Sequence, residues 1–272
     1  MMNNVLTILS SLSDWTAPEV DNATMMHGDM PGDKIEIGDS HKQKAATVFP
    51  VLVEKLKAVM ENHPHQRAVV CVFGGSGVGK SEIASLLGEY LQKAGVGSYV
   101  LSGDNYPHRI PAQNDAERLR VFRCGGVRGL VAGGVYSEEV KATLRTLQEQ
   151  DTDASPALCA EHPWLAVYQK EGKKALSGYL GTDREQNFEE LSAIISQFKN
   201  GAKEIYLKRM GRTPLDLWYD LVDFSEKNVL LIEWTHGNSN GFSGVDIRVL
   251  LNSTPQETLE HRRSRNRDGA VD

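Results

Sequence analysis

The stretch Gly74-Gly75-Ser76-Gly77-Val78-Gly79-Lys80-Ser81 decides the fold. It matches the phosphate-loop pattern G-x-x-x-x-G-K-[ST] at every fixed position. The apolar run 68–73 precedes it and the amphipathic run 81–91 follows it. Strand, glycine loop and helix in this order let backbone N–H groups turn inward on a phosphate at a helix N-terminus. We therefore predict a nucleotide-phosphate site in which Lys80 contacts the β- and γ-phosphates and Ser81 ligates Mg²⁺. The alternative is a glycine-rich turn that binds nothing.

Composition places the chain among globular proteins and argues against several function classes. Of its 272 residues, 40% are hydrophobic and 24% are charged, as is typical of a folded domain. The net charge of −6 argues against a general nucleic-acid binder. No run of 18 apolar residues occurs, so no membrane span is predicted. We expect neither nucleic acid nor membrane as a partner, while a homodimer stays open.

The cysteines and the N-terminus indicate the compartment. Cys71, Cys124 and Cys159 show no metal-ligand spacing, and an odd, sparse count suits a reducing environment. Residues 1–16 lack the basic start and apolar block of a signal peptide. We therefore expect a cytoplasmic protein, in which Cys71 is a small core residue of the first strand.

Further apolar runs extend the loop into a sheet. The segments 98–101, 229–233 and 246–251 are predicted strands, and helical segments separate them. Continuous apolar strands that alternate with helices indicate a parallel sheet covered on both faces. The predicted fold is therefore α/β, a P-loop NTPase-type sheet. A helix is expected at 47–61, with Pro50 in its first turn, where no N–H partner is lost.

The predicted organisation is an N-terminal arm, 1–45, followed by one domain, 46–272. A long, mainly helical insertion, 112–228, separates the second and third core strands and is interpreted as a substrate cap. The alternative is an ornament packed on the sheet edge. Helices are expected at 138–150 and 187–198, and the pairs Gly125-Gly126 and Gly133-Gly134 are interpreted as flexible turns.

Two acidic residues follow predicted strands at the edge where parallel sheets bind ligands. Asp104 comes after the second strand and Glu233 ends the third. A charge beside an apolar run is costly unless it faces a cleft, a metal or a partner. We predict that Asp104 accepts the proton of a substrate hydroxyl and that Glu233, with Ser81, organises Mg²⁺. The alternatives are a turn-forming Asp104 and a structural or helix-capping Glu233.

Arginines gather near the C-terminus of the sequence. Thr254-Pro255-Gln256-Glu257 predicts the capped start of a last helix, which carries Arg263, Arg265 and Arg267. Clustered arginines near a triphosphate would neutralise charge on the transferring phosphoryl group, and the alternative is a solvated basic face. A second group, Arg118, Arg120, Arg123 and Arg128, is interpreted either as contacts to an anionic substrate or as a solvated helix face.

Together these segments resemble a known family. The loop, Ser102-Gly103-Asp104-Asn105-Tyr106, the run 229–233 and Arg263-Ser264-Arg265-Asn266-Arg267-Asp268 look like the uridine kinase/phosphoribulokinase group of P-loop kinases. Gly103-Asp104-Asn105 is also similar to adenylylsulfate kinases. The resemblance implies that Asp104 is a base and that the arginine segment is a lid over ATP. As a departure from the family pattern, the sequence ends just after this segment. Two further departures stand out: Glu82 replaces the usual Thr or Ser, and Trp234 replaces a glycine.

These observations lead to one predicted function and one alternative. We predict an ATP- and Mg²⁺-dependent kinase that transfers the γ-phosphoryl group to a hydroxyl of a small metabolite, such as a nucleoside or sugar. The alternative is a nucleotide-dependent regulatory or switch module. A GTPase is disfavoured because no Asn-Lys-x-Asp motif occurs and the only Asp-x-x-Gly near the loop, residues 29–32, precedes it.

The predicted site residues fall into four groups. The catalytic residues are Asp104, Lys80, Arg263 and Arg267. The nucleotide-binding residues are Gly74, Gly75, Ser76, Gly77, Val78, Gly79, Lys80, Ser81, Glu82 and Arg265. The substrate contacts are Tyr106, His108, Arg109 and His236. The metal ligands are Ser81 and Glu233.

Overall fold

The computed structural model describes residues 5–21, 25, 27–33, 35–211, 213, 215–254 and 258. Two compact units are present. The first comprises Met1–Tyr106 and Phe188–Asp272, and the second is Pro107–Asn187. We describe each unit by itself.

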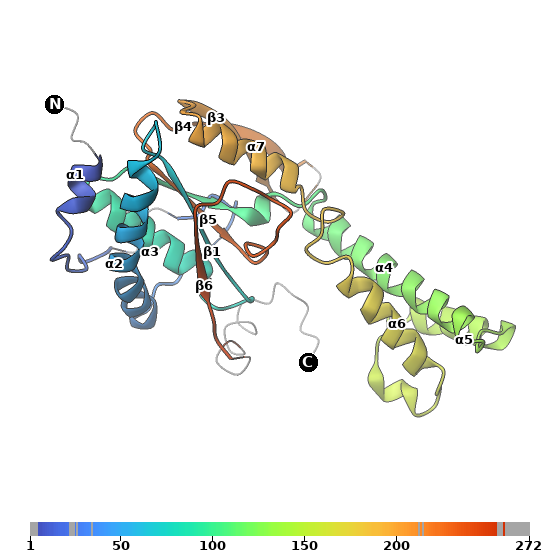
Figure 1. The fold of residues 1–272 in the computed structure, drawn as a ribbon. Coiled ribbons are helices and arrows are strands. Elements are labelled where there is room, and N and C mark those ends of the chain that lie inside the picture. Colours follow the sequence, from blue (N-terminus) through green and yellow to red (C-terminus); the bar gives the residue numbers. More distant parts are fainter. Residues whose placement is uncertain are drawn as a thin grey trace. The chain divides into compact units, whose positions relative to one another are not determined.

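The first unit is built on a four-stranded parallel sheet (Figure 1). Its strands are β1 (Ala68–Gly74), β2 (Ser98–Ser102), β5 (Val229–Trp234) and β6 (Ile247–Leu251), and their order across the sheet is β2-β5-β1-β6. The register places Glu233 of β5 between Val72 of β1 and Ser102 of β2. The predicted parallel sheet is therefore confirmed, and its carboxyl ends meet at one edge.

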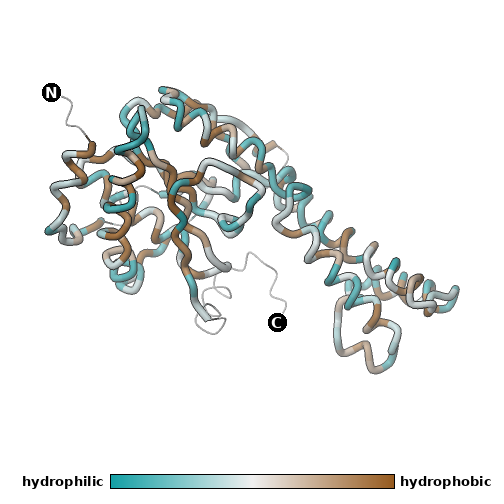
Figure 2. The backbone as a smooth tube through the Cα atoms, viewed as in Figure 1, coloured by the Kyte–Doolittle hydropathy of each residue, from teal (hydrophilic) through white to brown (hydrophobic). Residues whose placement is uncertain are grey.

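Helices cover both faces of this sheet because alternate strand residues point to opposite sides. Val70, Val100 and Leu231 pack with helices α1 (Val5–Ser10), α2 (Asp39–Glu61) and α3 (Lys80–Lys93). Val69, Leu101 and Ile232 pack with α7 (Phe188–Lys199) and the hairpin of β3 (Glu204–Met210) and β4 (Leu217–Asp223). Figure 2 shows the hydrophobic residues concentrated along the sheet strands.

The N-terminal segment belongs to the same core. Val5, Leu9 and Ile37 are buried with α2 and α3, and the Trp15 ring lies 4.4 Å from that of Phe49. Helix α2 begins at Asp39, so the expectation that Pro50 occupies a first turn is wrong. The extra turns bury Ala45 and Phe49, and this packing outweighs the hydrogen bond that a proline inside a helix removes.

The second unit contains helices α4 (Pro111–Ala132), α5 (Glu138–Glu149) and α6 (Leu165–Ser177), with a short 3₁₀ turn η2 (Pro156–Cys159). Gly125 and Gly126 lie inside α4, so their interpretation as a flexible turn is wrong. They let α4 and α6 approach closely: a Cβ on Gly125 would lie 2.3 Å from the Ala175 Cβ. Gly133 and Gly134 do form the turn that ends α4.

The second unit is shorter than the range 112–228 that is expected for the insertion. Helix α7 and the β3–β4 hairpin fall in that range, but they belong to the first unit. Helices α5 and α7 confirm the helices expected near 138–150 and 187–198. No helix in the described ranges is long and apolar enough to cross a membrane.

Candidate active site

The phosphate loop leaves the carboxyl end of β1 and enters α3. Gly74 and Gly79 have φ angles of +156° and +90°, which residues with a Cβ rarely adopt. A Cβ on Gly74 would lie 2.3 Å from the Leu251 carbonyl oxygen. The glycines are thus required both by backbone conformation and by the neighbouring strand β6. The loop has the strand-to-helix geometry that the sequence predicts.

Lys80 and Ser81 are the first two residues of α3, so their side chains start at the helix end that attracts anions. The Lys80 Nζ donates a hydrogen bond of 2.9 Å to the Gly75 carbonyl and so lies back over the loop. Ser81 is buried, and so is the neighbouring Glu82. One cation therefore lies on the loop, and one hydroxyl lies at the start of α3.

Glu233 is the buried acid of the site. Its Oε2 accepts a hydrogen bond of 3.1 Å from the Ser81 hydroxyl, and its Oε1 accepts another from the Ser102 hydroxyl. Burial raises its pKa to about 8, and the charge of Asp104 adds to this rise. The two serine hydroxyls and Lys80 oppose the shift. Burial and the Asp104 charge therefore favour the protonated form of Glu233, and added positive charge would favour the carboxylate.

These residues fit a magnesium ion that is shared with phosphate oxygens. Mg²⁺ is usually held by one or two carboxylates together with substrate phosphates rather than by an all-protein cage. In the described ranges, no three His, Cys, Asp or Glu side chains gather as such a cage. The Ser81 hydroxyl and the Glu233 carboxyl group supply the oxygen ligands that this arrangement needs.

Asp104 lies in the turn η1 (Gly103–Asn105), directly after β2. Its side chain is exposed, whereas Gly103 and Asn105 on either side of it are buried. Gly103 packs flat against the indole of Trp234, where a Cβ would lie 2.1 Å from the ring. A tightly packed turn therefore presents one exposed carboxylate at the edge that holds Glu233. Trp234, which the family resemblance marks as a departure, is the residue that packs the turn.

The predicted substrate contacts are placed very differently. Tyr106 is completely buried, burial raises the pKa of its hydroxyl, and the side chain has no face toward solvent. His236 follows β5 and contacts the Trp234 ring edge-on, with the ring centroids 5.5 Å apart. His108 and Arg109 belong to the second unit, where they bind the Asp183 carbonyl and the Tyr179 hydroxyl. The roles of these residues stay predictions.

The predicted lid arginines, Arg263, Arg265 and Arg267, lie outside the described residues. Cys71 is fully buried in β1, and burial raises its thiol pKa to about 12. Its interpretation as a core residue is confirmed.

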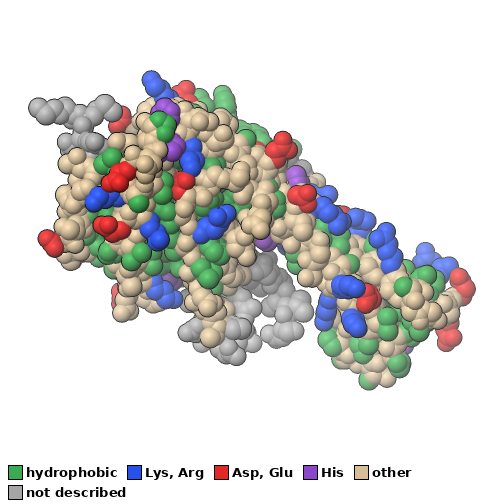
Figure 3. Space-filling view, in the orientation of Figure 1, with side chains coloured by type: hydrophobic (Ala, Val, Ile, Leu, Met, Phe, Trp, Pro, Cys, Tyr) green, Lys and Arg blue, Asp and Glu red, His purple; other side chains and the backbone are tan. Residues whose placement is uncertain are grey.

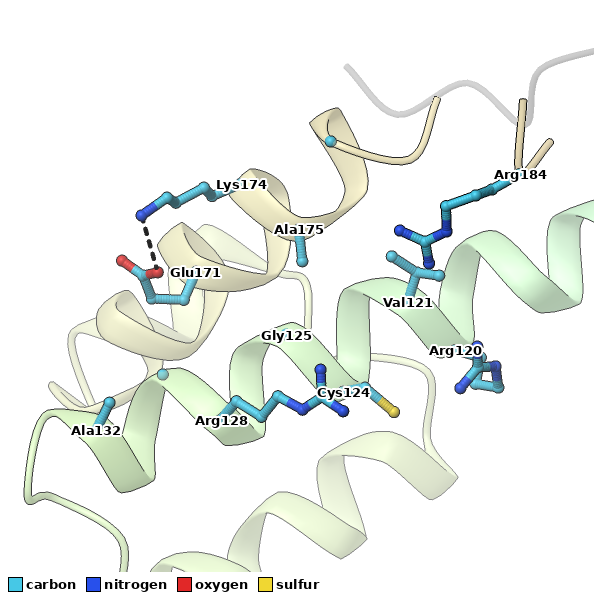
Figure 4. A pocket seen from close by; sticks show the side chains of 12 residues that line it. Arg120, Val121, Cys124, Gly125, Arg128, Ala132, Glu171, Lys174, Ala175 and Arg184 are labelled. Carbon is cyan, nitrogen blue, oxygen red and sulfur yellow. Dashed lines mark ion pairs between the residues drawn. The ribbon is translucent and has the colours of Figure 1, made fainter. Parts of the chain in front are cut away.

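The arginines of α4 are mostly engaged within the second unit, whose visible face carries many Lys and Arg side chains (Figure 3). Arg118 pairs with Glu185 at 2.7 Å, Arg120 with Glu117 at 2.7 Å, and Arg123 with Asp153 at 2.9 Å. Arg128 lines an open groove of about 620 Å³ between α4 and α6. Figure 4 shows this groove with the Glu171–Lys174 ion pair on its α6 side.

Two residues near the site were not predicted from the sequence: His41, at the start of helix α2, and Asp29, in the segment before it. The His41 ring lies against the loop, 3.0 Å from where a Cβ on Gly79 would be. The Asp29 carboxylate accepts hydrogen bonds from the Ser102 amide and the Asn105 side chain, on either side of Asp104. No motif surrounds either residue, and Asp29 stood out only as part of a misplaced Asp-x-x-Gly.

Comparison with known proteins finds sequence relatives that are named as kinases. No family model matches the chain. It is similar to the bifunctional alpha-galactosidase/sucrose kinase AgaSK of Mediterraneibacter gnavus, with 35% identity over 217 residues, 80% of this chain and 18% of that protein. It is also similar to the adenylyl-sulfate kinase of Escherichia coli O1:K1 / APEC, with 29% identity over 142 residues, 45% of this chain and 71% of that protein.

A solved structure from Silicibacter sp. TM1040, described as a "putative fructose transport system kinase", covers 84% of this chain and 84% of its own, with 15% identity and a TM-score of 0.48. The sequence relatives confirm the resemblance to P-loop kinases. The match spans only about a fifth of AgaSK, so that protein's whole activity does not transfer to this chain.

Proposed function

We propose that this protein is an ATP-dependent kinase that transfers the γ-phosphoryl group to a hydroxyl of a small molecule, and that this molecule is a sugar. The observation that carries the proposal is the contact between Ser81 of the phosphate loop and the buried Glu233, at the edge where Asp104 is exposed. Phosphate-binding backbone, metal-type oxygen ligands and a candidate base thus occupy one end of one sheet. The similarity to a protein named as a sucrose kinase favours a sugar acceptor.

The nucleotide half of the site would act by positioning and by charge. The loop amides and Lys80 would hold the β- and γ-phosphates in place. Bound Mg²⁺ would supply neutralisation of the charge on the phosphate oxygens. Glu233 and Ser81 would orient that ion, and Glu233 would have to release its proton to do so, because a raised pKa keeps it neutral otherwise.

The acceptor half would depend on Asp104. In a kinase, a carboxylate accepts the proton of the attacking hydroxyl as the bond to phosphorus forms. Asp104 is exposed on a turn whose neighbours are buried, so the carboxylate can reach an acceptor while the backbone stays fixed. Asn105 and Gly103 would then set the direction in which Asp104 points.

The test is acceptor-dependent phosphoryl transfer. Purified protein is incubated with MgATP and a panel of free sugars, disaccharides, nucleosides and adenylyl sulfate, and phosphorylated products are detected by ³¹P NMR. We expect one class of hydroxyl compound to be phosphorylated, and Asp104→Asn to lose that product. A regulatory or switch module would instead bind or hydrolyse ATP at a rate that no acceptor changes.

A further inference from the structure

The N-terminal segment 27–33 runs beside the carboxyl end of β2, where no sequence pattern places it. A Cβ on Gly28 would lie 3.9 Å from the Glu233 Oε1 and from Val100. The side chain of the next residue, Asp29, is only 8% exposed. This short segment therefore lies next to Glu233, the candidate metal ligand, and next to the turn that carries Asp104.

Asp29 uses both carboxylate oxygens. The Oδ1 accepts hydrogen bonds from the Ser102 backbone amide at 2.7 Å and from the Asn105 side chain at 3.1 Å. The Oδ2 accepts bonds from the Tyr99 hydroxyl at 3.0 Å and from Arg209 at 2.9 Å. One oxygen thus binds the two residues that flank the Gly103-Asp104 pair, and the other binds the surrounding core.

The contacts continue from the turn into the β3–β4 hairpin. The Asn105 side-chain oxygen accepts a hydrogen bond of 3.0 Å from the Met210 amide. Arg209, which pairs with Asp29, also pairs with Asp220 of β4 at 3.1 Å. The turn is therefore held from three directions: by Asp29, by β3 and by the Trp234 ring against Gly103.

Placing the Asp29–Arg209 ion pair away from water costs desolvation free energy, so the pair needs an explanation other than stability. Burial raises the pKa of Asp29, while Arg209, the Ser102 amide, the Tyr99 hydroxyl and Asn105 oppose that rise. A buried ion pair is often no more stabilising than apolar residues of the same volume. Its hydrogen bonds do, however, fix one geometry, and a displacement of about 1 Å near a reacting group can cost on the order of 10²-fold in rate.

We propose that Asp29 is a positioning residue: its Oδ1 fixes the Ser102–Asn105 turn and thereby the direction of the Asp104 carboxylate toward the acceptor. The catalytic consequence rests on the proposed kinase function. The structural consequence, that Asp29 holds the turn in place, is independent of the proposed kinase function. The N-terminal segment thus completes the acceptor side of the site.

The experiment compares two charge-neutral double variants that differ only at position 29. Asp29→Asn with Arg209→Met keeps a side-chain oxygen for the Ser102 amide, whereas Asp29→Ala with Arg209→Met does not. Because both remove the ion pair together, neither leaves a buried charge without its partner. Asp153→Ala with Arg123→Met is the matched control, since it also removes a buried acid together with its arginine partner, but in the second unit.

Amide hydrogen exchange at Ser102 is the first readout. We expect faster exchange in the Asp29→Ala double variant than in the Asp29→Asn double variant, and no change at Ser102 in the control with Asp153→Ala and Arg123→Met. Equal exchange in the two Asp29 double variants overturns the proposal, and this readout stays decisive if no acceptor is ever found. Failure of the kinase proposal is thus separated from failure of this one.

Steady-state kinetics with the identified acceptor is the second readout. The kcat of the Asp29→Ala double variant should fall below that of the Asp29→Asn double variant by on the order of 10²-fold. The KM for ATP should differ little between them, because the Asp29 carboxylate binds Ser102, Asn105, Tyr99 and Arg209, which lie on β2, on the turn after it and on β3. Equal kcat values, or a difference confined to the KM for ATP, contradict a positioning role.

Discussion

The packing of Gly103 against Trp234 gives a sharp prediction for Gly103→Ala. The added Cβ would lie 2.1 Å from the Trp234 Cγ and 2.5 Å from two further ring atoms, whereas ordinary carbon contacts are about 3.5–4.0 Å. The ring is 1% exposed, and its centroid lies 5.5 Å from those of Phe188 and Phe242. The indole therefore has little room to withdraw, and the turn itself must move.

Overpacking of this kind typically costs about 1–3 kcal/mol. For a domain of this size, each kcal/mol lowers the melting temperature by roughly 2–4 °C. We therefore expect calorimetry to show Gly103→Ala melting about 2–12 °C below wild type. The turn carries Asp104, so the rate of phosphoryl transfer should fall as well, while ATP binding should change little.

Two comparisons test the reasoning. Gly178→Ala is the control, because a Cβ there meets no atom closer than 3.6 Å, and its melting temperature should stay close to that of wild type. Adding Trp234→Leu to Gly103→Ala should cost less than the sum of the two single changes, by about 0.5–3 kcal/mol. Wild-type stability of Gly103→Ala, or strict additivity with Trp234→Leu, would refute the proposed contact.

Three further predictions concern the charged groups of the site. Lys80→Ala should abolish most of the rise in melting temperature that MgATP produces in wild type by mass action; an undiminished rise would show that the loop does not hold phosphate. Asp104→Asn should lower kcat by about 10²–10⁴-fold with little change in ATP affinity, and an unchanged kcat would exclude it as the base. Glu233 has a pKa of about 8 when folded against 4.5 ordinarily, so the folded protein keeps a proton that the unfolded chain releases between these values. Unliganded stability should therefore fall as pH rises from about 5 to 8, and Glu233→Gln should remove this part of the fall; identical pH profiles would contradict the burial of that acid.

The sequence predicts the fold best where the backbone conformation or the burial of a residue leaves a recognisable local sequence pattern. The glycines of the phosphate loop, the apolar strands and the acid at the end of β5 each leave a local signal, and the structure places them together. The helix α2 and the pair Gly125-Gly126 were misjudged for the opposite reason. A proline or two adjacent glycines normally interrupt a helix, but here tertiary packing keeps both segments helical. Phe49, next to Pro50, is buried against the core, and Gly125 and Gly126 let α6 approach α4 closely.

The acceptor side was harder to predict because its contacts are long-range. Asp29 lies more than seventy residues from Ser102 in the chain, and Arg209 more than a hundred residues beyond that. No spacing rule links such residues, since only the fold brings them together. The sequence also does not show that the side chain of Tyr106, two positions after the candidate base, lies in the core, and its role as a substrate contact stays a prediction.

The most direct test of the central claim is ADP formation measured with and without an acceptor. With MgATP alone, wild-type protein should release ADP slowly. A sugar or other hydroxyl compound from the panel should raise the rate and yield one phosphorylated product per ADP, and Asp104→Asn should abolish the increase without loss of ATP binding. ATP binding with no acceptor-dependent product across sugars, nucleosides and adenylyl sulfate, or a product that Asp104→Asn forms as fast as wild type, would contradict the account.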